Sequence, residues 1–188
     1  MEPSIGRGAG TRLSSQTAHR GPGTAPVNIA VDMKHDLAEV APGKILYRLS
    51  ESEVASTVER WMACFGKDSE GIHVDQFMWH VFSNRRFPSV SRAAALEQYP
   101  QHEAHEYVVL SNDRDEAFTT DIRPVECSLS DWLVFPANLA WTMAFTHEDE
   151  WLGPYFARHP QFSALDAENR ARLEKAREAE RARQKGWA

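Results

Sequence analysis

The chain has 188 residues, of which 42% are hydrophobic, and it carries a formal net charge of −6. This length suits one domain with tails, and the six Trp and nine Phe suffice to build a core. No apolar run approaches the roughly 18 residues that a membrane-spanning helix needs, which argues against a membrane protein. The N-terminus lacks the apolar region of a secretory signal, so we expect a cytoplasmic protein.

The charge is concentrated in the middle of the chain. Residues 41–160 carry ten basic and eighteen acidic side chains, a net charge of −8, whereas residues 161–188 come to +2. Nucleic-acid affinity comes largely from Lys and Arg that neutralise phosphates, so we expect no direct nucleic-acid binding by this region. A basic protein partner would instead be attracted to it.

Two tails flank the predicted domain. Residues 1–40 form a leader that is rich in Gly, Pro, Ser and Thr and is predicted to be disordered. Translation could begin at Met1 or at Met33. Residues 161–188 contain many Ala, Glu and Arg with little apolar periodicity, which predicts a solvated, charged helix, with a partner-docking tail as the alternative.

Three helices are predicted in the domain. Ser50 and Glu53 have capping-box spacing ahead of an apolar stripe, which predicts an amphipathic helix over 51–65. The aromatic segment 73–83 favours a buried helix that carries Trp79 and His80. Ser91 is a candidate cap for a short helix over 93–97.

Four strands follow, over 106–110, 117–120, 133–135 and 139–145. In the last strand heavy apolar residues alternate with small ones, the period of a strand with one large face. Two successive hairpins predict a four-stranded antiparallel meander. The N-terminal helices would cover it, giving a two-layer α+β fold over residues 41–160.

The segment from His147 to Glu150, HEDE, follows the last strand directly. A rigid strand end is a common place for a general acid, a general base or a metal ligand, and neighbouring carboxylates raise the pKa of an imidazole. An ordinary polar loop has the same composition. If the helix over 73–83 lies across the sheet, His80 could approach His147.

Aromatic residues beside these acids suggest a second kind of site. Trp151, Tyr155 and Phe156 flank the Gly153-Pro154 turn, and aromatic residues beside charges are typical of protein interfaces. This predicts a binding surface formed by Glu148, Asp149, Glu150, Trp151, Tyr155 and Phe156.

Other candidate chemistry is weak. His102 and His105 could share one helical face, but a third ligand is missing, so a surface loop is expected and no metal site is predicted. Cys64 and Cys127 have no CxxC spacing and no His beside them, which favours buried, reduced thiols. Phosphate-binding and nucleophile motifs are absent from the sequence, so no cofactor is expected.

The motifs WHVFS at 79–83, FTHE at 145–148 and LGPYF at 152–156 resemble those of a family of small bacterial proteins known only as a domain of unknown function. The resemblance covers about residues 45–160 and implies the domain limits. It singles out His80, His147, Glu148 and Tyr155 and implies no mechanism.

Two hypotheses about function follow. The first is an acidic, immunity-protein-like binding module that neutralises or regulates a basic protein. The alternative is a small hydrolase or metal-dependent enzyme that uses His147 and Glu148, with His80 and Tyr155 as further catalytic residues. A third hypothesis, a scaffold subunit, requires assembly through the C-terminal helix.

Overall fold

The computed structural model describes residues 38–149 and 151–186. The predicted disordered leader therefore lies outside the described residues, except for its last three. Of these, Ala38 is buried, and Val40 belongs to strand β1 (Val40–Ala41), which pairs with β6 (Glu126–Cys127). The described fold thus begins slightly before residue 41.

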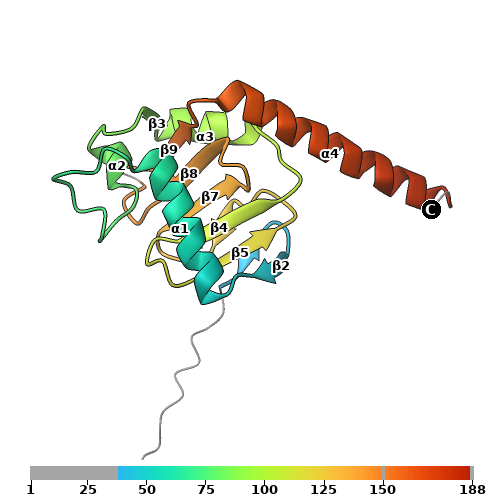
Figure 1. Ribbon diagram of the computed structural model, residues 1–188, viewed down its shortest axis with the longest axis horizontal. Coiled ribbons are helices and arrows are strands. Elements are labelled where there is room, and N and C mark those ends of the chain that lie inside the picture. Colours follow the sequence, from blue (N-terminus) through green and yellow to red (C-terminus); the bar gives the residue numbers. More distant parts are fainter. Residues whose placement is uncertain (1–37, 150, 187–188) are drawn as a thin grey trace, which may run out of the picture. The chain divides into compact units, whose positions relative to one another are not determined.

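A seven-stranded antiparallel sheet forms the centre of the domain (Figure 1). Its strands in spatial order are β2 (Ile45–Arg48), β5 (Ala117–Thr120), β4 (Tyr107–Ser111), β7 (Trp132–Pro136), β8 (Trp141–Phe145), β9 (Tyr155–Arg158) and β3 (Ser89–Ser91). The four predicted strands are β4, β5, β7 and β8, and they are neighbours in this sheet. The predicted α+β class with an antiparallel meander is confirmed, and β2, β9 and β3 extend the sheet.

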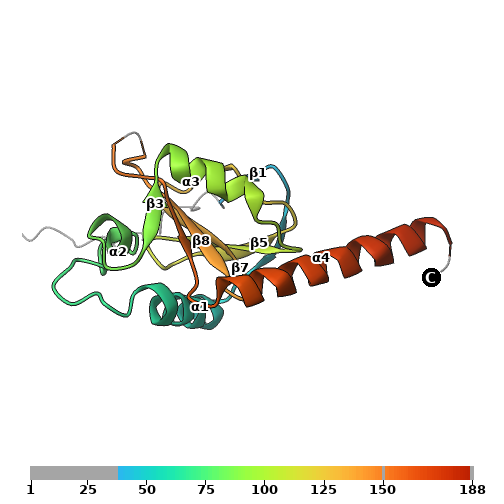
Figure 2. The ribbon, with the colours of Figure 1, turned by 90° about the horizontal axis from the view of Figure 1, so that it is seen from above.

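Both faces of the sheet are buried. On one face α1 (Glu51–Phe65) and α2 (His80–Ser83) cover an apolar core, and on the other α3 (Ala93–Gln98) and η1 (Tyr99–Gln101) cover a second (Figure 2). Strands β4 and β7 are buried at every position, because successive side chains enter opposite cores. Val109 and Leu110 show this directly, since each contributes to a different core.

Helix α1 matches its prediction at both ends. Its capping box is present, and the Glu53 carboxylate accepts hydrogen bonds from the Ser50 backbone N–H and hydroxyl, each at 2.8 Å. These bonds lower the pKa of Glu53, with the bond from the Ser50 backbone as the largest cause. The helix ends at Phe65, before Gly66.

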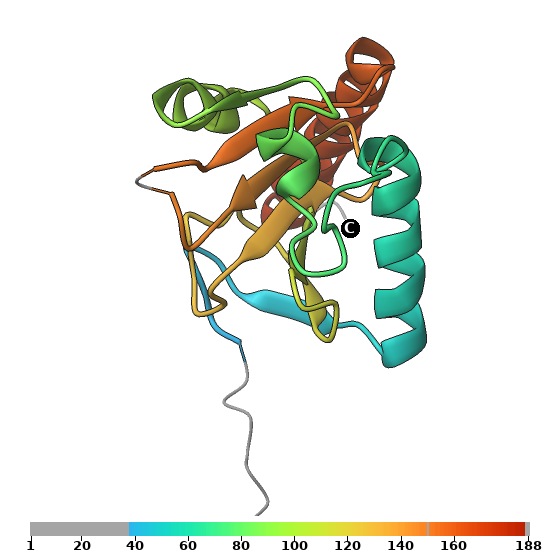
Figure 3. The same cartoon turned by 90° about the vertical axis from the view of Figure 1, so that its left-hand side faces the viewer.

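The prediction of one helix over 73–83 was wrong in extent. Residues 74–79 form turns, and α2 begins only at His80 (Figure 3). The Asn112 side chain explains the difference, because it accepts a hydrogen bond from the Met78 backbone N–H at 2.9 Å and donates one to the Gln76 carbonyl at 2.9 Å. These two backbone groups therefore form hydrogen bonds with a side chain distant in sequence and not with backbone groups of a helix.

The short helix α3 begins at Ala93, as predicted, but the prediction of Ser91 as its cap was wrong. Ser91 is the last residue of β3, and Arg92 occupies the N-cap position with φ of 57°. The Arg92 backbone N–H instead donates to the Pro154 carbonyl at 2.9 Å, which joins this turn to the start of β9.

The predicted C-terminal helix is present as α4 (Phe162–Gln184). Asn138, in the β7–β8 turn, holds its first turns by donating to the Leu165 carbonyl at 2.9 Å and accepting from the Asn169 amide at 3.1 Å. Most of the later residues are exposed. Within the described residues, no helix combines the length and apolar content needed to cross a bilayer.

Candidate functional site

The β7–β8 hairpin brings His147 to Asp131. Trp132 pairs with Phe145 in this hairpin, so the residues just outside the pair, Asp131 and Thr146, leave the sheet side by side. His147 follows at once. Its ring Nδ1 lies 2.8 Å from Asp131 Oδ2, and its backbone N–H donates to Asp131 Oδ1 at 2.7 Å.

This pairing favours the protonated form of the imidazole. The hydrogen bond that His147 Nδ1 donates to the Asp131 carboxylate raises the pKa of His147, and the charges of Asp131, Glu148 and Asp149 act in the same direction, against a smaller effect of burial. The second ring nitrogen, Nε2, is 3.8 Å from Glu148 Oε1. The His147 side chain is 47% exposed and the Asp131 side chain 9%, so a carboxylate with little exposure orients an accessible imidazole.

The raised pKa can be tested in solution. Asp131→Asn should lower the His147 pKa toward the ordinary value of 6.5, measured by NMR titration of the ring protons. Because the folded pKa is the higher one, this pair stabilises the fold fully below the unfolded pKa and loses that effect as pH rises through the folded pKa. Glu148→Gln, which removes a lesser cause, should lower the pKa less. Equal shifts in the two variants would contradict the assignment.

His147 is also part of a cluster of five rings, which we call the aromatic cluster: Phe77, Trp79, His80, His147 and Tyr155. The His147 ring centroid lies 5.3 Å from that of Phe77 and 6.2 Å from that of Trp79. His80 contacts the same two rings, at 5.2 and 4.5 Å. The structure therefore brings both histidines onto one pair of rings, although α2 is much shorter than predicted.

His80 and Tyr155 have mainly packing contacts in this cluster. His80 Nδ1 lies 3.2 Å from the His73 carbonyl oxygen, and the Tyr155 ring stacks on Trp79 at 6.1 Å. Tyr155 and Phe156 are 6% and 2% exposed. Their rings belong to the cores of the domain rather than to its surface.

The remaining candidate residues lie in the turn between β8 and β9 and differ in how exposed they are. Asp149 points back into the turn, where its carboxylate accepts hydrogen bonds from the Thr146 backbone N–H at 2.7 Å and the Thr146 hydroxyl at 3.0 Å. Burial raises its pKa, and these bonds oppose that effect. Glu148 is half-buried, and Trp151 is 71% exposed. Glu150 lies outside the described residues.

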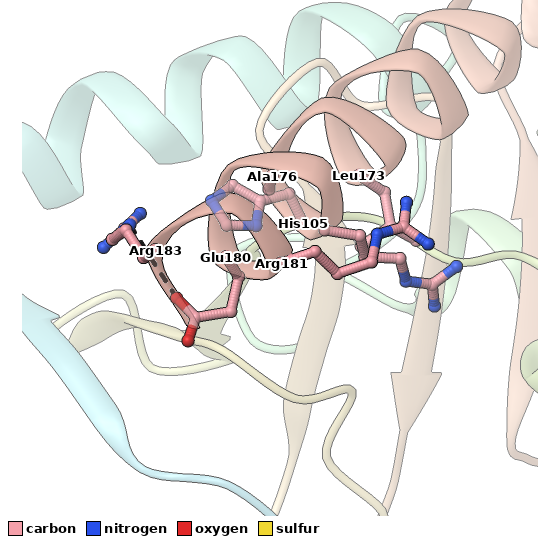
Figure 4. Close-up of a pocket in the computed structure, with 7 residues that line it drawn as sticks. His105, Leu173, Ala176, Glu180, Arg181 and Arg183 are labelled. Carbon is pink, nitrogen blue, oxygen red and sulfur yellow. Dashed lines mark ion pairs between the residues drawn. The ribbon is translucent and has the colours of Figure 1, made fainter. Parts of the chain in front are cut away.

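The two other histidines that the sequence singled out have separate surroundings. His102 packs against Phe156 and Phe162, and burial lowers its pKa. His105 faces α4 across a surface hollow of about 530 Å³ that is also lined by Leu173 and Ala176 (Figure 4). None of the described residues predicted to be catalytic or to form the binding surface lines this hollow.

Metal and thiol chemistry find little support in the described part of the chain. Within residues 38–149 and 151–186, no group of three His, Cys, Asp or Glu side chains could hold a metal ion. Burial raises the pKa of the Cys64 thiol to about 11 and also raises that of Cys127. Both thiols therefore stay protonated near neutral pH, when they are poor nucleophiles.

Sequence reasoning missed Asp131, the partner of His147. The available signal was the hairpin itself, because the two residues that flank an antiparallel strand pair must leave the sheet together. It also missed that Arg85, Arg86 and Arg92, which flank β3, line one pocket, because the other wall of that pocket comes from the start of β9.

Fold and site together define a small α+β domain in which one hairpin end carries an oriented imidazole and a braced turn with an exposed Trp. A family model described as Domain of unknown function (DUF4275) matches residues 50–156, more than half of the chain. The chain therefore belongs to this family, as the resemblance of its motifs implied. No curated protein and no solved structure matches it.

Proposed function

We propose that this domain is an acidic protein-binding module of the cytoplasm, which neutralises or regulates a basic protein partner in the manner of an immunity protein. The observation that carries the proposal is the exposure of Trp151. At 71% it is the most exposed large hydrophobic side chain in the described domain. Tryptophan is strongly enriched among the residues that dominate interface energies.

The backbone around Trp151 is held before any partner arrives. The Glu148 carbonyl accepts hydrogen bonds from the backbone N–H groups of Trp151 at 2.8 Å, Leu152 at 2.7 Å and Gly153 at 3.2 Å. The Arg92 guanidinium donates to the Trp151 carbonyl. A preorganised turn loses little conformational entropy on binding, which favours affinity.

Charge supports a basic partner. The region 41–160 carries a net charge of −8, and Glu148 lies in the same turn with its side chain 34% exposed. Complementary charge speeds encounter and penalises partners of the wrong sign. Arginine-rich or lysine-rich proteins fit this surface, and acidic proteins and nucleic acids do not.

The proposal is tested by affinity capture of the full chain from its native lysate, followed by titration of the captured partner after purification. We expect a stoichiometric basic protein. Trp151→Ala should weaken its binding by about 2 kcal/mol or more, roughly thirtyfold in Kd, as for an interface hot spot. Glu148→Lys should weaken it through charge reversal, with the larger effect at low salt.

Val125→Ala and Glu126→Lys are matched controls. They remove one exposed apolar side chain, 57% exposed in the wild type, and reverse one exposed charge at β6. Both should bind the partner as the wild type does. Equal losses in the control and test variants, or a partner that is acidic, would contradict the proposal.

The geometry of His147 keeps the enzyme hypothesis as the second candidate. A carboxylate on Nδ1 with Nε2 left accessible is the arrangement that orients a histidine as a general base. His147→Ala separates the two candidates. Under the first, the variant binds the captured partner with unchanged affinity, and under the second it stays folded while losing turnover of whatever substrate the wild type processes.

A further inference from the structure

A surface pocket of about 550 Å³ lies between the end of α2, strand β3 and the start of β9, and Leu152, the residue after Trp151, is part of its lining. Three arginines, Arg85, Arg86 and Arg92, contribute to its wall, and none of its described lining residues is acidic. Within a domain of net charge −8 such a local excess of positive charge is unexpected. It identifies the pocket as a candidate site for an anion.

The three guanidinium groups differ in the number of hydrogen bonds and ion pairs that they make within the protein. Among the described residues, Arg85 has no ion pair and no hydrogen bond for its guanidinium. Arg86 has one exposed carboxylate, Asp68, at 3.7 Å, and donates to the Glu70 carbonyl at 3.1 Å. Arg92 donates to the Trp151 carbonyl. Each guanidinium has five N–H donors, so all three retain donors for a ligand.

Backbone conformation is a second, independent observation. Arg85 and Arg92 both have φ of 57°, in the left-handed region that favours glycine. Residues held there cost about 1 kcal/mol or more, and they occur at helix ends and turns and cluster at functional sites. Two of the four such non-glycine residues in the described chain are thus arginines of this one pocket.

The pocket wall also contains apolar and hydroxyl-bearing residues, which could contact the uncharged part of an anionic ligand. Phe82, Phe87 and Tyr155 are among its lining residues; Phe82 and Tyr155 are 2% and 6% exposed, whereas Phe87 is half-buried. The residues Ser83, Ser89 and Ser91 also line it, so hydroxyl donors are at hand. A flat or apolar group can contact the half-buried Phe87 and Leu152 while its anionic end meets the guanidinium groups.

We propose that this pocket binds a small phosphorylated molecule, a phosphate monoester carried on a flat or apolar group. The planar, forked guanidinium matches the oxygens of a phosphate, and three of them supply more positive charge than a carboxylate needs. The volume accommodates a ligand of metabolite size. The inference does not depend on the protein-binding function, because none of its test variants changes Trp151 or Glu148.

The experiment is a calorimetric titration of the full chain with phenyl phosphate, inorganic phosphate and benzyl alcohol. Phenyl phosphate should bind, inorganic phosphate should bind more weakly, and benzyl alcohol should not bind measurably. Arg85→Gln should lower the affinity for phenyl phosphate about tenfold, the loss of roughly one charge-assisted hydrogen bond. Its melting temperature should stay near that of the wild type, because the Arg85 guanidinium has no ion pair or hydrogen bond to the described residues.

Arg172→Gln is the matched control. Arg172 is an exposed arginine of α4, also without an ion pair or hydrogen bond to the described residues, so the variant loses the same charge elsewhere. It should bind phenyl phosphate as the wild type does. Equal weakening in both variants would indicate attraction by net charge alone, and absence of binding to the wild type at millimolar phenyl phosphate would also overturn the proposal.

Discussion

Trp61→Ala is expected to destabilise the domain by about 3–5 kcal/mol, a large share of the roughly 5–15 kcal/mol that stabilises a typical domain. Trp61 is fully buried between α1 and the sheet, and its ring lies 5.3 Å from Phe65 and 5.8 Å from Phe82. Its indole N–H donates to the Thr142 hydroxyl at 3.1 Å. Alanine leaves a cavity and removes this donor.

Urea unfolding of the full chain, followed by circular dichroism, measures this loss. Trp151→Ala is the control, because it makes the same substitution at a side chain that is 71% exposed. Its effect on the free energy of unfolding should stay within about 0.5 kcal/mol. Similar losses in the two variants would mean that Trp61 is not the core residue described above.

Gly153→Ala is expected to cost about 1–3 kcal/mol through steric overlap in the turn between β8 and β9. A Cβ at this position would lie 2.6 Å from Asp149 Oδ1 and 2.7 Å from Thr146 Oγ1. These atoms are themselves hydrogen-bonded to each other at 3.0 Å, and Thr146 is buried, so neither moves freely. Relief of the overlap breaks the bonds that close the turn.

A double-mutant cycle separates this mechanism from a general loss of stability. Asp149→Ala removes the nearest clashing atom, so Gly153→Ala should cost less in that background than in the wild type. The free energies of unfolding of all four proteins give the coupling. Additive costs would show that the Asp149 carboxylate is not what excludes a side chain at position 153.

The sequence correctly predicted the helix and the hairpins whose stabilising residues lie close together in the chain. The helix over 51–65 has its cap, its apolar stripe and its terminating glycine within a single stretch, and all three are present in the structure. The hairpins of β4 with β5 and β7 with β8 are likewise formed by strands close in sequence. Their alternation of heavy and small residues, or their β-branched runs, identified them.

The structural features that the sequence did not predict depend on contacts between residues far apart in the chain. The segment 74–79 has a helical apolar pattern, but Asn112, more than thirty residues away, takes its backbone hydrogen bonds. Strand β3 is recognisable only by its pairing with β9, so the pocket with three arginines at that junction was not apparent. His147 was identified as a candidate from its strand end, whereas the aspartate that orients it required the register of the hairpin.

The two ends of the sheet also bear on how the protein behaves at high concentration. A long, flat edge strand invites pairing with another chain and so promotes aggregation. Here β3 has only three residues and follows Pro88, and the pairing of β2 with β5 is irregular between Ile45 and Tyr47. Short or irregular edges offer few consecutive backbone groups to an incoming strand. Pairing of these edge strands with strands of another chain is therefore disfavoured. We expect contacts with other molecules to be made by side chains instead.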